Sequence, residues 1–334
     1  MTGYLESVFQ IVRAGLNTSS YKFGLLRALV ALAPGTDLDR PTISIAALAE
    51  KFVEMYWPLE VIYHLRQATN PDRDPAFMKE IRQLILDRHV RHGQSLDDFK
   101  RCDPVRYGTL LRSTEKLAFR YVISVFHNLR GATVTPALFS HEGDISKGIT
   151  LNAGAREFLI THGRLIDFMT IAAWVDFSES VVSAPKLFLK LSGERATRKN
   201  IAAKWGGTLK ALQDGHCFYC SASDSTEYHV DHFLPWSYVL EDKTWNLVLA
   251  CRACNSDKSD RLPPSEQIER LVTRNDMLVK GQLPDQDMFL RDFVEWRARD
   301  LAGHVRSLHD QARVEQFPVW ERSGVPVIPA STSR

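Results

Sequence analysis

Two Cys-x-x-Cys pairs constrain the fold of this 334-residue chain more than any other feature. The first pair is Cys217 and Cys220, the second is Cys251 and Cys254, and thirty residues separate them. Each pair can form a tight turn that directs two thiolates to one point, and two such turns complete a tetrahedral zinc site with no open coordination position. The spacing therefore predicts a structural Zn²⁺ that joins two short segments. The fifth cysteine, Cys102, is expected to be a core residue.

The composition is that of a globular protein. Apolar residues make up 44% and charged residues 25% of the chain, which excludes a disordered or collagen-like chain, and the length suits about two domains. The most apolar stretch, residues 23–33, is too short to span a bilayer and contains Arg27, and Glu6 stands where an export signal would be basic. We therefore expect a cytoplasmic protein without a membrane partner. In such a compartment paired cysteines favour metal over disulfide.

Side chains suited to phosphodiester hydrolysis lie between and directly after the cysteine pairs. The sequence reads Val-Asp-His-x-x-Pro over residues 230–235, Asn246-Leu before the second pair, and Cys-x-x-Cys-Asn-x-x-Lys over residues 251–258. A neutral imidazole such as that of His232 is a suitable general base near neutral pH. The carboxylate of Asp231 and the amide oxygen of Asn255 are ligands that Mg²⁺ accepts. Such a cation relieves charge on the phosphate and on the leaving oxygen.

In combination, these motifs resemble the HNH endonuclease family, also called ββα-metal or His-Me finger nucleases, over residues 216–262. The end of this stretch also resembles HNH domains of RNA-guided CRISPR nucleases. The resemblance implies that His232 is the general base, that Asp231 and Asn255 hold the catalytic metal, and that Asn246 fixes the loop that orients the base. Asn255 stands where the family name has a histidine. Together with an aspartate, it favours Mg²⁺ or Mn²⁺ over a catalytic zinc.

Each of these residues also has a structural interpretation. Asp231 and His232 could form a surface pair in a turn, while Asn246 and Asn255 could cap a turn or a helix. Lys258, on the same helical face as Asn255, either contacts phosphate or is solvated. A decayed site would have lost at least one of the first four residues. Their joint presence favours an enzyme over the alternative, a non-catalytic zinc-finger DNA-binding protein.

Positive charge is concentrated just before the cysteine-rich segment. Residues 186–210 hold seven Lys or Arg against one Glu, whereas the whole chain has 42 Lys and Arg against 40 Asp and Glu. Cations that displace counterions from phosphates give DNA affinity its salt dependence. We therefore expect nucleic-acid contacts from Arg195, Arg198 and Lys199. The alternative is a solvated linker, the usual role of a charge run.

The rest of the chain reads as helical, so the predicted fold is mainly α with an embedded zinc-stapled ββα-metal (HNH) finger. Apolar periodicity predicts helices over 20–33, from Ser44 past Pro58 as two helices or one kinked helix, and around 77–85, 117–125 and 157–182. A helix capped by Ser265 and a last long helix carrying Phe289, Phe293 and Trp296 follow. The predicted regions are an α-helical domain of unassigned role at 1–185 with a hairpin near 133–151, a basic linker at 186–215, the finger at 216–264, and C-terminal helices with a frayed tail at 265–334.

The sequence thus predicts a metal-dependent DNA endonuclease with a structural Zn²⁺ and a catalytic Mg²⁺ or Mn²⁺. Bacterial restriction or anti-phage defence is the expected setting, and a homing or mobile-element endonuclease is the alternative. A single HNH centre cuts one strand, so double-strand cleavage calls for two centres, which a homodimer would supply. An activating or targeting partner protein is a further expected partner.

Overall fold

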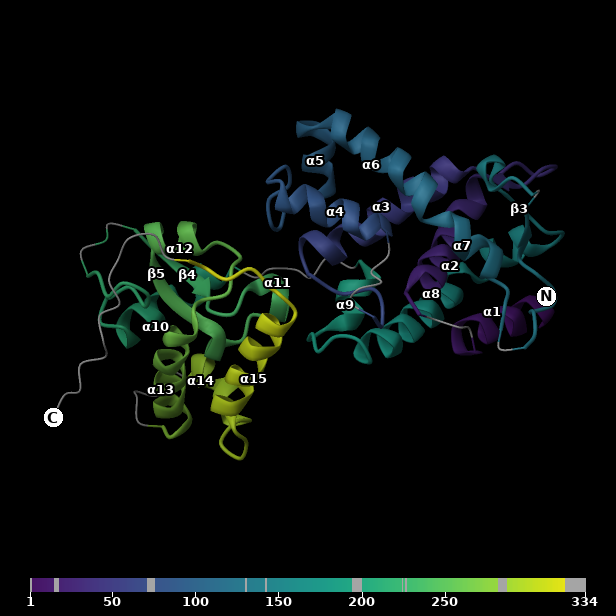
Figure 1. The fold of residues 1–334 in the computed structure, drawn as a ribbon. Coiled ribbons are helices and arrows are strands. Elements are labelled where there is room, and N and C mark those ends of the chain that lie inside the picture. Colours follow the sequence, from purple (N-terminus) through teal and green to yellow (C-terminus); the bar gives the residue numbers. More distant parts are fainter. Residues whose placement is uncertain are drawn as a thin grey trace. The chain divides into compact units, whose positions relative to one another are not determined.

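The computed structural model describes residues 2–14, 18–70, 76–129, 131–141, 143–193, 200–223, 225, 227–281 and 287–321. The chain divides into two compact units, Met1–Arg195 and Ala196–Arg334, both built mainly of helices (Figure 1). The division lies inside the segment expected to be a basic linker. Helices lie on either side of it, because α9 (Leu187–Ser192) belongs to the first unit and α10 (Ile201–Leu212) to the second.

The first unit packs its helices around one aromatic and aliphatic core. Its centre is formed by α2 (Tyr21–Leu32), α3 (Ile45–Val61) and α8 (Ala155–Glu179), and α2 contacts both of the others. α3 begins where the Ser44 hydroxyl accepts from the Ala47 amide, and it runs through Pro58 as a single helix. The remaining helices are α1 (Thr2–Ala14), α4 (Ala76–Leu86), α5 (Leu96–Cys102), α6 (Pro104–Leu117) and α7 (Phe119–Val125).

By length and composition alone, α8 is apolar enough to cross a membrane. One such helix is weak evidence, because the core helix of a soluble protein passes the same test. In the structure, α8 contacts α1, α2 and α9, and it buries Phe158, Ile166 and Trp174 in the core of the first unit. One face of α8 thus packs in this core, while Ile160, Leu165 and Phe168 on the same helix are exposed.

A small antiparallel sheet closes one end of the first unit. Its strands are β1 (Thr42–Ile43), β2 (Phe139–Ser140) and β3 (Ile149–Leu151), in the order β1-β3-β2. β2 and β3 pair antiparallel within residues 133–151, where a hairpin is expected. Gly148 precedes β3 with φ 90°, and a Cβ there would overlap the carbonyl oxygen of Ile43. Only glycine therefore lets β3 approach β1 so closely.

The second unit is organised around a two-stranded antiparallel sheet followed by a helix. β4 (Tyr228–His232) pairs with β5 (Leu247–Cys251), and α12 (Arg252–Lys258) follows β5 directly. The loop between the strands contains α11 (Trp236–Val239) and the 3-10 turn η4 (Thr244–Asn246). This ββα arrangement is the one expected for the finger.

Helices at both ends of the second unit complete the core of the finger. α10 packs on both strands, while α13 (Ile268–Val279), α14 (Asp287–Val294) and α15 (Leu301–Val314) follow the finger in sequence. The strand residues, the cysteines and side chains of these helices form one buried cluster. A two-stranded sheet with one short helix buries too little apolar area to fold by itself, so the added helices supply what it lacks.

Three details of the C-terminal helices differ from the sequence prediction. Ser265 starts the 3-10 turn η5 (Ser265–Gln267), and its side chain caps no helix, because α13 begins three residues later. α14 carries Phe289 and Phe293 but ends before Trp296. α15 was not singled out in the sequence, although its buried residues Leu301, Val305, Leu308 and Ala312 follow the three-four spacing of an amphipathic helix. The expected frayed tail, residues 324–334, lies outside the described residues.

Candidate active site and metal centre

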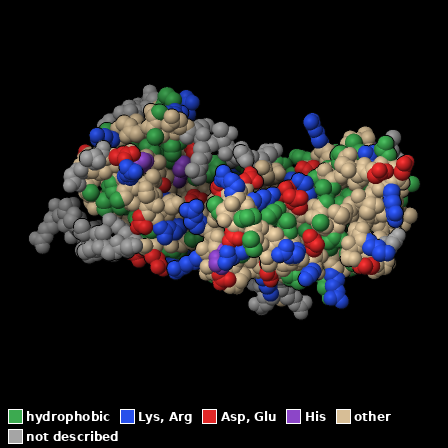
Figure 2. Space-filling model, turned by 90° about the horizontal axis from the view of Figure 1, so that it is seen from above, with side chains coloured by type: hydrophobic (Ala, Val, Ile, Leu, Met, Phe, Trp, Pro, Cys, Tyr) green, Lys and Arg blue, Asp and Glu red, His purple; other side chains and the backbone are tan. Residues whose placement is uncertain are grey.

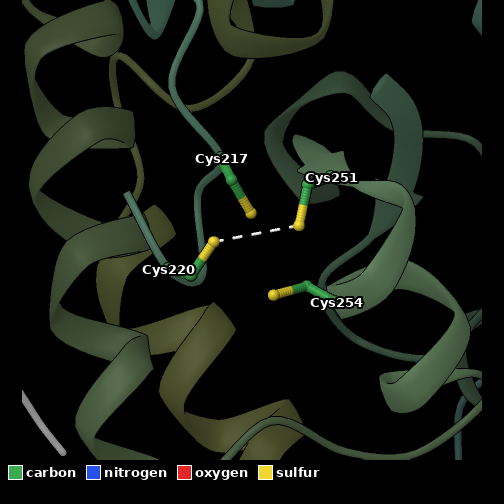
Figure 3. Close-up of side chains that lie close together, drawn as sticks. All are labelled: Cys217, Cys220, Cys251 and Cys254. Carbon is green, nitrogen blue, oxygen red and sulfur yellow. Dashed lines mark hydrogen bonds between the residues drawn. The ribbon is translucent and has the colours of Figure 1, made fainter. Parts of the chain in front are cut away.

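The four paired cysteines meet at one point, as Figure 3 shows. Cys217 and Cys220 lie in the turn after α10, while Cys251 ends β5 and Cys254 lies in the first turn of α12. Their sulfur atoms all lie within 4.8 Å of one another, and Cys220 Sγ is 3.8 Å from Cys251 Sγ. Four sulfurs about 2.3 Å from a tetrahedral zinc would be about 3.8 Å apart. The donor set and its spacing therefore fit one zinc ion.

The chemistry of the cluster also suits a cation. The hydrogen bond between Cys217 and Cys254 lowers the pKa of the Cys217 thiol and raises that of the Cys254 thiol. A bound cation would favour the deprotonated form of all four thiols, which is the form that binds zinc. Cys102, by contrast, is exposed, so the expectation that it is a core residue is wrong.

A pocket of about 450 Å³ lies beside β4 and α12. It is lined by the side chains that sequence analysis assigns to catalysis, Asp231, His232 and Asn255. β4 brings the first two, and α12 brings Asn255 from the other end of the finger. Asp260 also lines this pocket, and its carboxylate was not singled out in the sequence.

Asp231 is nine-tenths buried and has two donors on one oxygen. The Tyr219 hydroxyl donates to Asp231 Oδ2 at 2.6 Å, and Lys258 Nζ lies 3.0 Å from the same atom. Burial is the main cause that raises the pKa of Tyr219 well above its usual value, and the Asp231 charge adds to it. The tyrosine therefore remains a hydroxyl donor to the carboxylate.

His232 is held by a second carboxylate. Its Nε2 lies 2.9 Å from Asp242 Oδ1, and the two side chains are only 12% and 9% exposed. Burial lowers the pKa of His232 below its usual value and outweighs the opposite effects of Asp242 and Asp231. The imidazole is therefore neutral near pH 7 and retains one nitrogen lone pair, as a general base requires.

Asn246 ties the two ends of the loop between the strands. Its Oδ1 accepts from the Leu234 amide at 2.8 Å, its Nδ2 donates to the Leu234 carbonyl at 2.9 Å, and its side chain is fully buried. The Phe233 amide also donates to the Asn246 carbonyl at 2.8 Å. These bonds fix the residues that directly follow His232. The loop-holding role of Asn246 stays a prediction from the sequence resemblance.

Comparison with known protein families supports this interpretation of the second unit. Residues 220–264 match the family model described as HNH endonuclease. Residues 1–115 match a model described as a domain of unknown function (DUF8808). No curated protein and no solved structure matches the chain.

The HNH endonuclease segment depends on residues outside the matched range. On α13, Arg274 donates to the carbonyls of Trp245 (2.9 Å) and Leu247, and Asn275 donates to the Trp245 carbonyl at 3.0 Å. On α14, Asp292 accepts from the Thr244 amide at 3.0 Å. The turn that carries Asn246 is therefore fixed by two helices that follow the HNH segment. Sequence analysis missed these contacts because nothing in local spacing indicates them.

The expected nucleic-acid contacts have different outcomes. Lys258 lines the pocket, but its side chain is 1% exposed, and its Nζ also donates to the His232 carbonyl at 2.8 Å. It is therefore held inside the HNH segment, and a solvated lysine, one of the two alternatives, is wrong. Arg195, Arg198 and Lys199 lie outside the described residues. They precede Ile201, the first residue of α10, which lines the same pocket.

Proposed function

We propose that this protein is a metal-dependent DNA endonuclease that hydrolyses phosphodiester bonds at the pocket beside β4 and α12. The observation that carries the proposal is the meeting of Asp231, His232 and Asn255 at one pocket, within a segment that matches an HNH endonuclease model. A neutral, oriented imidazole and two oxygen donors are the groups that hydrolysis of a phosphodiester needs.

Each residue has one role in this proposal. His232 accepts a proton from the attacking water, and Asn246 keeps the backbone after His232 in place. Asp231 and Asn255 would hold one Mg²⁺ or Mn²⁺, which would supply positive charge at the phosphate and at the leaving 3′ oxygen. The four cysteines would hold a structural Zn²⁺, which would join the turn after α10 to the start of α12.

The biological setting that we propose is restriction or anti-phage defence in the bacterial cytoplasm. The presence of a helical unit in addition to the HNH unit supports this, because target recognition or activation needs surface beyond a nuclease finger. A homodimer would bring two centres to a duplex. We propose DNA as the substrate, and an activating or targeting protein as a further partner of the helical unit.

Cleavage of supercoiled plasmid by the purified full chain with Mg²⁺ tests the proposal. His232→Ala should lower the cleavage rate by about 10²–10⁴, because it removes the proton acceptor. His229→Ala is the matched control, since it removes a partly exposed histidine from the same strand. Wild-type cleavage by His232→Ala in a nuclease-free preparation would show that the finger is a binding module.

Variants of the other three residues should fail in different ways. Asp231→Ala and Asn255→Ala remove proposed metal ligands, so excess Mg²⁺ or Mn²⁺ should partly restore their cleavage. Asn246→Ala should have an intermediate rate that metal does not restore, because it loosens the loop without removing a reacting group. A metal titration of nicking separates the two patterns, and equal rescue of all four variants would contradict these roles.

A further inference from the structure

The carboxylate that contacts His232 comes from the loop between the strands. Asp242 lies between α11 and η4, ten residues after His232, and its Oδ1 is 2.9 Å from His232 Nε2. With both side chains about nine-tenths buried, water competes little for this hydrogen bond. A carboxylate accepts and does not donate, so the ring nitrogen that faces it carries the hydrogen.

The position of Asp242 is fixed from both sides of the finger. Two residues later, Thr244 is bound by Asp292, whose carboxylate accepts from its amide at 3.0 Å and lies 3.3 Å from its hydroxyl oxygen. Four residues later, Asn246 is tied to Leu234, which itself follows His232 by two residues. The loop that carries the carboxylate and the strand that carries the imidazole therefore share the same anchors. The contact between Asp242 and His232 is therefore held by the same hydrogen bonds that fix the fold of this loop.

We propose that Asp242 is a positioning residue of the nuclease, which holds the His232 ring so that Nδ1 is its proton acceptor. This inference rests on the proposed function. In the reaction, Nδ1 takes a proton from water, the water oxygen bonds to phosphorus, and the bond from phosphorus to O3′ breaks. The leaving oxygen takes a proton from solvent. Asp242 accepts the hydrogen bond from Nε2–H and stabilises the imidazolium that forms.

A double-mutant cycle tests whether Asp242 acts through His232. Asp242→Ala should lower the plasmid-nicking turnover by about 10- to 100-fold. In the His232→Ala background, the same change should alter the residual rate by less than about twofold. The half-saturating concentrations of DNA and of Mg²⁺ should stay the same, because Asp242 is proposed to orient the base and to bind neither. Asp242→Asn keeps the side-chain shape, and it replaces the alanine variant in these assays if that variant fails to fold.

Two further measurements make the outcome specific. Glu241→Gln removes the neighbouring charge and should cleave at the wild-type rate. Nitrogen-15 NMR of histidine-labelled full chain, without DNA, should show a His232 Nε2 proton protected from exchange with water, which Asp242→Ala should lose because it removes the acceptor. This second readout does not depend on activity.

The possible failures can be told apart. Two results would overturn the role of Asp242 and leave the nuclease intact. One is wild-type cleavage by Asp242→Ala. The other is an Asp242→Ala change that lowers the rate by the same factor in the His232→Ala background as in the wild-type protein. The absence of a protected Nε2 proton in the wild type also overturns this role. A wild-type protein that never cleaves DNA overturns the proposed function, and this proposal with it.

Discussion

At the scale of residues, Tyr219 links the cysteine cluster to the proposed catalytic carboxylate. It stands between Cys217 and Cys220, and its hydroxyl donates to Asp231 Oδ2. Its ring packs edge-on against Trp320, whose indole donates to Asp257 on α12 at 2.9 Å. A side chain of the first cysteine turn thus orients a carboxylate on β4 toward the pocket.

Tyr219→Phe should weaken the binding of the catalytic metal while leaving the zinc in place. The change keeps the ring and removes one hydrogen bond to a charged group, a contact worth about 1.5–3 kcal/mol. Asp231 should then be less well oriented, so a higher Mn²⁺ concentration should be needed for half-saturation. A direct Mn²⁺-binding titration measures this. Tyr228→Phe, which removes a hydroxyl bonded to the Ala222 carbonyl, is the control. Unchanged or tighter Mn²⁺ binding by Tyr219→Phe would contradict this.

The residues that could be predicted from the sequence are those whose roles depend on local spacing. Asp231, His232 and Asn255 stand in short motifs, and the structure brings them to one pocket. Asp242 and Tyr219 contact His232 and Asp231 across a loop and across the finger. An aspartate in a loop and a tyrosine beside a cysteine are common without such roles, so no pattern indicated them.

At the scale of elements, the cysteine cluster ties together two segments of the ββα finger that are far apart in the sequence. The cluster joins the turn after α10 to the junction of β5 and α12, and three of its four cysteines are buried. A site of four thiolates has no position for substrate, so its contribution is structural. Metal binding and folding are therefore expected to be coupled in this unit.

Replacement of a clustered cysteine should unfold the HNH unit. Cys220→Ser or Cys254→Ser should reduce bound zinc from about one ion per chain to none, because four ligands are needed for a closed tetrahedral site. Elemental analysis and limited proteolysis measure the two effects. Cys102→Ser changes an exposed cysteine of the other unit and should change neither. A soluble, active protein without zinc would refute the structural role.

The observed helix boundaries match the predicted ones where apolar periodicity and helix-ending residues such as Pro and Gly agreed. α2 ends at Leu32, just before Pro34 and Gly35, and α8 covers most of the predicted stretch. The apolar positions Leu117, Tyr121 and Val125 also mark helices, but all three are exposed, so their spacing did not report a buried face. The role of α13 and α14 in fixing the loop between the strands arises from tertiary contacts, which helical periodicity does not encode.

At the scale of the whole molecule, charge is balanced except near the unit boundary. On the face drawn in Figure 2, Lys and Arg side chains are interspersed with Asp and Glu over the N-terminal unit. The chain as a whole has nearly equal numbers of both. The cationic residues 195, 198 and 199 directly precede α10, whose first residue lines the proposed active-site pocket. DNA held near that pocket is therefore expected to meet this segment.

Neutralising that segment should weaken DNA binding and its dependence on salt. If Arg195, Arg198 and Lys199 contact phosphates, changing all three to Gln should weaken binding to every sequence alike. The slope of log affinity against log salt should fall by up to about one unit per lost contact, because fewer counterions are released. Fluorescence anisotropy of a labelled duplex over a salt series, with Ca²⁺ in place of Mg²⁺, measures this slope.

The matched control is the triple Gln variant of Arg13, Lys79 and Arg88, which are exposed residues of the first unit. Since it removes the same charge, it separates contact from net charge: equal slopes for the two variants would assign residues 195–199 to a solvated connection.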